Sequence, residues 1–337
     1  MIEFPGYAEL HCRSNFSFLT GASHPAELVE RAKALRYAAL AITDECSLAG
    51  VVRAHVAARE AGLHLIIGSE MRLCLPSPVD DKGAPAAHAR LVLLAQTRRG
   101  YGNLSHWITV ARRRAAKGEY LAHPGDIEGK VPTAPTLAGL PECLALLAPD
   151  SSQSVETVLE HATWLKRWFQ DRASITLSLL RRPGDEKLRK TVRFIARLTG
   201  LPIVASGDVL MHVRSRKPLQ DTLSATRLKQ PVSRCGQDLE SNAEQYLRPR
   251  TRLIMLYERE WLQNTLVLAN RCSFSLAELK YEYPREVVPE GQTPSSHLRK
   301  LSLAGMPTRF PKHRYSMSQR RKYRKQFARE LTLIRKL

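Results

Sequence analysis

The sequence has no CxxC pair, no unbroken apolar run of about 18 residues, and few acidic residues for its basic content. The six cysteines lie far apart, which excludes a zinc ribbon and a secreted disulfide framework and fits a reducing cytoplasm. The N-terminus, MIEFPGYAEL, lacks the basic and then apolar pattern of a signal peptide. We therefore expect a soluble, cytoplasmic protein with no membrane partner.

The charge balance is strongly basic. Lys and Arg number 52 against 32 Asp and Glu, a formal net charge of +20 over 337 residues. The excess lies towards the C-terminus, because residues 213–337 have 26 basic and 11 acidic residues and residues 1–212 have 26 and 21. Such a charge favours a polyanionic partner, above all nucleic acid. A GC-rich genome also produces arginine-rich surfaces, and that alternative stays open.

The segment 7–50 is the most informative part of the sequence. Two apolar runs, 8–12 and 38–43, each stop at polar residues, and the stretch between them has the pattern of a helix with Ser23 as N-cap. Polar residues at the carboxyl ends of the strands in such a strand–helix–strand unit commonly bind ligands. His11 and Asp44 are therefore the first candidates for chemistry.

Alternation of apolar runs and helical patterns continues to residue 206 and favours a closed or nearly closed α/β barrel over an open sheet. A proline-rich surface loop is expected at 76–89. Beyond His212 the alternation stops, and 218–227, 258–271 and 319–337 look helical while 281–294 looks extended. The further predicted strands are 64–68, 91–95, 143–148, 174–180 and 201–206, and the further predicted helices are 47–62, 101–116, 155–170 and 186–199.

Several stretches of the sequence have a recognisable order of residues. They include ELHCRSNFSFLTGASHPAELVERA, AITDECSLAGVVRAHVAA, LIIGSEMRL, ASGDVLMHVRSRKPLQDTLSATR and YEYPREVVPEG. Together they resemble the N-terminal region of bacterial error-prone DNA polymerases of the C family, relatives of the DNA polymerase III alpha subunit. That region is a PHP (polymerase and histidinol phosphatase) domain, a distorted barrel of seven βα units. The resemblance implies a PHP domain at 1–212 and the start of the polymerase region, a smaller mainly helical segment leading into palm and thumb, at 213–337.

The resemblance also implies a function. The chain would be the N-terminal part of a DNA-directed DNA polymerase, a nucleotidyltransferase of damage-tolerant synthesis. Its partners would be DNA, the remaining polymerase domains, and other translesion or replication proteins. Family members hold Mg²⁺ on palm aspartates, whereas Asp221 and Asp238 are the only aspartates after residue 212. We therefore expect this chain alone to be inactive as a polymerase, and to be a piece of a longer protein or the product of a truncated gene.

Metal-binding PHP domains hold up to three divalent ions, mostly on histidines and carboxylates at strand ends. By resemblance, ligand-type residues survive at His11, Glu45, Glu70 and Asp208. The positions Arg13, Thr20, Arg90 and Leu210 stand where the family has ligands. An aliphatic chain cannot coordinate a metal, and a guanidinium stays protonated and repels one. We expect no catalytic residue, no metal and no cofactor on this chain, with Arg13 and Arg90 paired to the surviving carboxylates.

Three hypotheses remain open. The first is a degenerate PHP scaffold within the polymerase, and the second is a working metal-dependent phosphoesterase or 3′–5′ exonuclease. The third is a stand-alone module that binds DNA or a partner protein through its basic C-terminal part. Alternatively, that basic part is a helix face that docks on a further domain. The candidate DNA-binding residues are Arg214, Arg216, Lys217, Arg320, Arg321, Lys322, Arg324 and Lys325.

Overall fold

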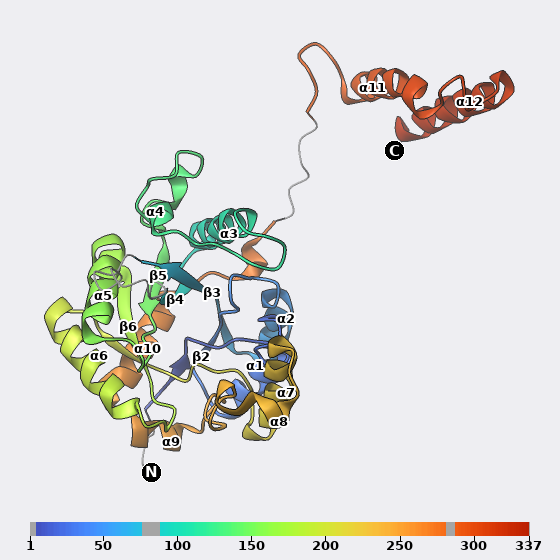
Figure 1. Cartoon of the computed structure of the whole chain (residues 1–337). Coiled ribbons are helices and arrows are strands. Elements are labelled where there is room, and N and C mark those ends of the chain that lie inside the picture. The colour runs from blue at the N-terminus through green and yellow to red at the C-terminus, as the bar shows by residue number, and fades with distance from the viewer. Residues whose placement is uncertain (1–4, 76–87, 281–286, 337) are drawn as a thin grey trace, which may run out of the picture. The chain divides into compact units, whose positions relative to one another are not determined.

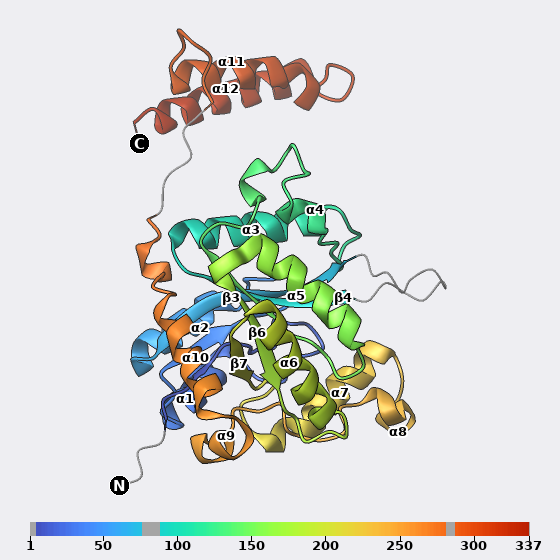
Figure 2. The same cartoon turned by 90° about the vertical axis from the view of Figure 1, so that its left-hand side faces the viewer.

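The structure is a computed structural model that describes residues 5–75, 88–280 and 287–336. The chain divides into two compact units, Met1–Leu279 and Lys280–Leu337. The larger unit is an α/β barrel and the smaller one is a pair of helices, drawn from two directions in Figure 1 and Figure 2.

One seven-stranded sheet forms the centre of the larger unit, and strands that follow one another in sequence are neighbours in space. The sequence predicts all seven strands. They are β1 (Ala8–Glu9), β2 (Ala39–Ile42), β3 (His64–Cys74), β4 (His88–Ala95), β5 (Cys143–Leu147), β6 (Ala173–Ser178) and β7 (Ile203–Ser206). β1 to β3 pair in parallel, and so do β5 to β7. Parallel neighbours need crossover connections, which the helices between them supply.

β4 runs antiparallel to both of its neighbours, a direction that the pattern of apolar runs does not specify. In its pairing with β3, Gly68 lies opposite Leu94 and Met71 lies opposite Leu91. Antiparallel strands can be joined without a helix, and the proline-rich connection between these two has no helical pattern. The predicted loop at 76–89 lies outside the described residues except for its last two positions.

Helices cover the sheet, as Figure 2 shows for α5 and α6. Each predicted helix of the barrel is present within a few residues of its expected ends, and Gly62 and Gly200 end α2 and α6 with positive φ angles. No helix among the described residues is long and apolar enough to cross a membrane. The helices of the barrel are α1 (Pro25–Ala34), α2 (Val51–Ala61), α3 (Arg98–Arg113), α4 (Pro124–Ile127), α5 (Val155–Phe169) and α6 (Asp185–Thr199), and of these the sequence does not predict α4.

The segment after residue 212 packs on the barrel as far as Leu279, so the predicted domain boundary at 212 does not coincide with a break between compact units. The guanidinium of Arg248 is buried and donates to the carbonyl of Leu179 at 2.8 Å. The Tyr257 hydroxyl donates to the carbonyl of Ser206 at 2.7 Å. The helices of this segment are α7 (Lys217–Leu228), α8 (Val232–Cys235), α9 (Arg250–Leu256) and α10 (Arg259–Asn270).

The seam between β1 and β7 is closed at two levels. Just beyond both strands, Val209 N donates to His11 O and Arg13 N donates to Val209 O, each at 2.9 Å. At the amino ends of the two strands, α10 spans the gap, because Thr265 Oγ1 accepts from Ala8 N at 3.0 Å and Asn264 donates to Ile203 O at 2.8 Å. The result is a nearly closed barrel in which the post-barrel segment satisfies the edge groups of both strands.

The smaller unit consists of α11 (Pro294–Arg309) and α12 (Met317–Ile334). The sequence predicts α12 but not α11, whose interior Pro307 argues against a helix. Phe327 and Leu331 of α12 line a groove together with Leu298 of α11, so this apolar side of α12 faces α11. Residues 287–336 contain no buried side chain. Of the predicted extended segment 281–294, residues 281–286 lie outside the described residues.

Candidate functional site

Five polar side chains predicted at strand ends come together at one end of the barrel. His11 and Arg13 follow β1, Glu70 lies in β3, Arg90 lies in β4, and Asp208 follows β7. All five are withdrawn from solvent, and the most exposed, Arg90, has a side-chain exposure of 23%. The barrel closure brings His11 and Asp208 together from opposite ends of the PHP-like segment.

His11 contacts both carboxylates of this cluster. Its Nε2 atom lies 2.5 Å from Glu70 Oε2 and 3.5 Å from Asp208 Oδ1. Its Nδ1 atom is buried and has no hydrogen-bond partner among the described residues. The ligand-type atoms of these three residues all lie within 4.8 Å of one another. By residue type and spacing, the three are a group that could hold one metal ion.

Two guanidinium groups share this space. Arg13 Nη2 donates to Asp208 Oδ1 at 2.7 Å, and Arg13 Nη1 lies 3.6 Å from Glu70 Oε1. Arg90 Nη2 donates to Asp208 Oδ2 at 3.0 Å. Both oxygens of Asp208 therefore bind arginine, and two permanent cations stand beside His11. The five residues together fit an ion-pair cluster and do not fit a cluster of divalent metals.

The backbone at Asp208 aims its carboxylate into the cluster. Its φ of +44° lies in the left-handed region, which aspartate and asparagine adopt more readily than most residues. The next residue, Val209, pairs with the chain after β1, and Gln245 Nε2 donates to Asp208 O at 3.0 Å. The turn is thus held from both sides, by the barrel and by the post-barrel segment.

The arginines set the charge of the two buried carboxyl groups. Burial by itself would raise the pKa of Glu70, but Arg13, Arg90 and the contact with His11 outweigh it and lower that pKa to about 2. Burial likewise opposes ionisation of Asp208, and the same two arginines overcome it and hold its pKa well below the usual range. Both groups are ionised at neutral pH.

This arrangement predicts a specific loss of stability in acid. A carboxylate with a depressed folded-state pKa contributes stability above its unfolded-state pKa of about 4, and the contribution is lost as the pH falls towards the folded-state value. For Glu70 the loss falls between that unfolded-state value and about 2. We therefore expect the free energy of unfolding, measured in urea, to drop less between about pH 5 and pH 3 in Glu70→Gln than in the unsubstituted chain.

The exposed carboxylate of Glu186, on α6, supplies the control for this measurement, because its weak contact with Arg189 spans 3.9 Å at the surface. Glu186→Gln should keep the pH dependence of the unsubstituted chain. An unchanged pH dependence in Glu70→Gln would show that the arginines do not stabilise the Glu70 carboxylate.

Glu45 lies beside the cluster with partners of its own. Its Oε1 atom is 3.1 Å from Arg72 Nε and accepts from the Tyr120 hydroxyl at 2.9 Å. Arg72 was not predicted as part of the site, although it lies two residues after Glu70 in the same strand and therefore on the same face. Tyr120 lies between the predicted helix at 101–116 and the predicted strand at 143–148, and nothing in the sequence points to it.

Thr20 and Leu210, the remaining positions where the family has ligands, contribute no ligand atom to the cluster. The Thr20 hydroxyl donates to Phe18 O within its own loop at 3.4 Å. The side chain of Leu210 is buried. His212 Nδ1 lies 2.8 Å from the Ser23 hydroxyl, and burial lowers the pKa of His212. Because Leu210 cannot coordinate and His212 contacts Ser23, no second imidazole joins His11 among the described residues of the cluster.

Asp44, predicted as a candidate for chemistry, instead organises the loop after β1. Its Oδ1 accepts from Ser14 N at 2.7 Å and from the Ser17 hydroxyl at 2.8 Å, and its Oδ2 accepts from the Ser14 hydroxyl at 2.8 Å. Gly50 packs against it, because a Cβ there would lie 2.7 Å from Asp44 Oδ2. These contacts give Asp44 a structural role.

The predicted DNA-binding residues fall into two groups. Near the barrel, Arg216 pairs with Glu27, Lys217 pairs with Asp221, and Arg214 lies 5.8 Å from the centre of the Tyr246 ring. The cations of α12 have no carboxylate partner among the described residues. Arg320 is half-buried, and the other cations of this helix are exposed. That second group is Arg320, Arg321, Lys322, Arg324 and Lys325.

A family model for the PHP domain matches residues 9–177, half of the chain and six of the seven strands. The chain belongs to the PHP domain family. The ion-pair cluster of this PHP barrel lies at the strand ends where the resemblance places family ligands, and Asp208 extends it beyond the matched residues.

Relatives of this PHP chain include two proteins named error-prone DNA polymerase. The one from Bordetella parapertussis is 55% identical over 91% of the chain, and the one from Ralstonia nicotianae is 48% identical over 100%. The chain spans only 28% and 30% of the length of these two relatives. A solved amidohydrolase structure from Chromobacterium violaceum, with bound sulfate and no metal, covers 61% of this chain and 88% of its own at 16% identity and a TM-score of 0.42.

Proposed function

We propose that the chain is the N-terminal part of an error-prone DNA-directed DNA polymerase that acts on DNA in the cytoplasm during damage-tolerant synthesis. The support is the similarity of nearly the whole chain to proteins of that name. Because the chain spans less than a third of them, nucleotidyl transfer and its Mg²⁺ ions belong to parts beyond this match.

Within that polymerase, the PHP barrel is a metal-free scaffold. The observation that carries this proposal is the binding of both Asp208 oxygens by Arg13 and Arg90. Guanidinium charge here balances the buried carboxylates that metal ions balance in metal-binding members of the family. The cluster then stabilises the end of the barrel without supplying an activated water.

The two-helix unit offers a surface to the remaining polymerase domains. Its groove, of about 660 Å³, is lined by Leu298, Phe327 and Leu331, and Leu301 is 57% exposed nearby. A pair of helices that buries no residue fully gains little from its own packing, so it needs cover from another element. We expect the remaining polymerase domains to supply that cover, and other replication or translesion proteins to bind elsewhere.

Metal content and phosphodiesterase activity distinguish a scaffold from a working phosphoesterase. After dialysis against Mn²⁺, the full chain should contain well under one equivalent of Zn, Mn or Fe by inductively coupled plasma analysis. It should hydrolyse bis(p-nitrophenyl) phosphate no faster than buffer, because two guanidinium groups repel cations from the remaining donors. The double substitution Arg13→His with Arg90→His, which supplies two imidazoles, should bind more Mn²⁺ under the same conditions.

The opposite outcome would be a stoichiometric metal in the unsubstituted chain together with hydrolysis that Glu70→Gln abolishes. That result would establish the phosphoesterase and reject the scaffold. Polymerase identity would be unaffected, since it depends on the parts of the protein beyond this chain.

A further inference from the structure

The outer face of α6 carries an apolar patch that the barrel does not use. Leu188 and Ile195 of this helix are buried against the core, yet Phe194 is 49% exposed and Leu198 is 58% exposed. These two residues are four apart, so they are neighbours on one face of the helix. Adjacent large apolar side chains in solvent commonly mark a site of interaction.

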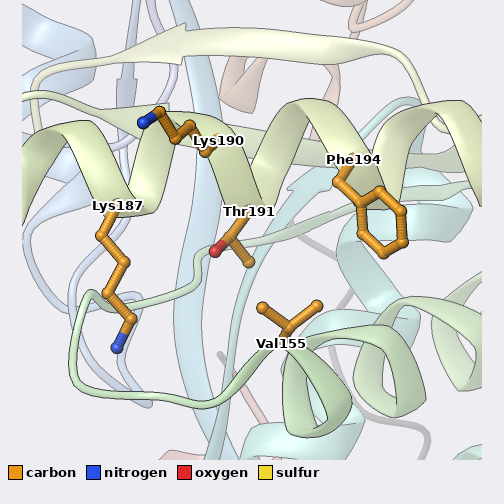
Figure 3. Close-up of a pocket in the computed structure, with 5 residues that line it drawn as sticks. All are labelled: Val155, Lys187, Lys190, Thr191 and Phe194. Atoms are coloured by element: carbon orange, nitrogen blue, oxygen red, sulfur yellow. The ribbon is translucent and has the colours of Figure 1, made fainter.

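Phe194 borders a hollow between α6 and the start of α5. The hollow has a volume of about 590 Å³ and lies over two helices that pack against each other. Figure 3 shows Lys187 and Phe194 extending from α6 towards the side on which Val155 lies, while the ammonium group of Lys190 points away. Its lining residues are Val155, Lys187, Lys190, Thr191 and Phe194.

The hollow combines an apolar floor with uncompensated positive charge. α6 has five basic and two acidic residues. Lys187 Nζ donates to the carbonyl of Ser151 at 2.9 Å, and within the described part of the chain neither Lys187 nor Lys190 pairs with a carboxylate. The arginine nearest to Phe194 in sequence, Arg193, already pairs with Glu258 at 3.3 Å. Both cations that line the hollow are therefore left to meet an acidic partner.

We propose that this hollow docks a short helix of another protein, one with an apolar anchor residue flanked by Glu or Asp. A groove between two packed helices matches the ridge of a third helix. The anchor would contact Phe194 and Val155, and its flanking carboxylates would meet Lys187 and, after the exposed side chain of Lys190 turns towards the hollow, Lys190 as well. A second copy of this chain is a poor occupant because it presents the same positive charge. A nucleic acid backbone would satisfy the lysines and leave the apolar floor uncovered.

A peptide-display selection on the immobilised full chain tests the proposal. The library displays helical peptides of about 16 residues, with apolar and charged positions randomised. Selected peptides should carry an aromatic or leucine anchor with acidic residues three or four positions away. Synthetic copies are then titrated against the chain by fluorescence polarisation, and a single-stranded oligonucleotide serves as competitor.

Two matched pairs of variants decide the outcome. Phe194→Ser and Lys190→Glu should each weaken binding by about tenfold or more, as expected for central contacts. Val267→Ser on α10 and Lys166→Glu on α5 remove a similarly exposed apolar group and another exposed lysine, both outside the hollow, and should bind as the unsubstituted chain does. Circular dichroism confirms that each variant is folded.

Either of two results would overturn the proposal. One is a selection in which no enriched peptide depends on Phe194. The other is displacement by the oligonucleotide with a loss of binding in Lys190→Glu and none in Phe194→Ser, which would assign the face to nucleic acid.

Discussion

Replacing Asp208 by asparagine is expected to lower the free energy of unfolding by roughly 3–5 kcal/mol, the range for breaking a buried ion pair from one side. The substitution removes the negative charge that both Arg13 and Arg90 contact, and leaves two guanidinium groups in a buried site. Asparagine tolerates the positive φ of this position and has nearly the same shape, so backbone strain and packing change little. The loss in free energy of unfolding should therefore come from the broken ion pairs of Asp208 with the two arginines.

Urea unfolding at neutral pH measures this effect against a surface control. Asp171 also binds an arginine, Arg271, at 3.0 Å, but its side chain is 81% exposed. Asp171→Asn should cost about 1 kcal/mol or less, because exposed ion pairs contribute little. Equal effects of the two substitutions would show that the barrel-end cluster is no stronger than a surface pair.

Adding Arg13→Met, Arg90→Met and Glu70→Gln to Asp208→Asn provides a second check on the cause. Removing all four charges leaves neither an arginine nor a carboxylate of the cluster unpaired, and neutral replacements of buried ion pairs are often close to neutral in stability. We expect the quadruple variant to recover much of the stability that Asp208→Asn alone loses. A quadruple variant less stable than the single one would point to packing of the arginine side chains instead.

The sequence predicts the strands well because each is a short apolar run that ends abruptly, as at Leu147 and Ser206. Periodicity cannot specify direction, however, and β4 runs antiparallel to both of its neighbours. The pattern also stops being informative at His212, since the later helices follow no strand. Only the folded chain brings Thr265 and Asn264 to the seam between β1 and β7.

The composition of the cluster follows from the resemblance, whereas its pairing depends on three-dimensional proximity. His11, Glu70 and Asp208 occupy family ligand positions, and the structure brings them within contact distance. Arg13 and Arg90 both bind Asp208 and not Glu45 because the turn after β7, where Asp208 has a positive φ, directs its carboxylate towards them. Conversely, polarity at a strand end misleads at Asp44, whose oxygens are all used by nearby serines. A carboxylate at a strand end is a candidate for a site only when the adjacent loop does not satisfy its oxygens with hydrogen bonds.

Neutralising the basic face of α12 is expected to weaken DNA binding by roughly a hundredfold at about 50 mM salt, if four cations contact phosphates. Each contact releases counterions from DNA, so each lost cation lowers the slope of log affinity against log salt by about 0.7 to 0.9. Filter binding or fluorescence anisotropy of the full chain with single- and double-stranded oligonucleotides at several salt concentrations measures both quantities. The variant changes Arg321, Lys322, Arg324 and Lys325 to glutamine.

A matched variant separates this helix from a general effect of net charge. It removes four exposed cations from the barrel unit and should keep a salt slope close to that of the unsubstituted chain, because cations that do not contact the bound phosphates release few counterions. Equal losses in both variants would mean that the chain attracts DNA only through its total charge. Absence of binding even at low salt would instead favour α12 as a docking face for the remaining polymerase domains. The residues of the matched variant, each changed to glutamine, are Arg59, Arg113, Lys117 and Lys166.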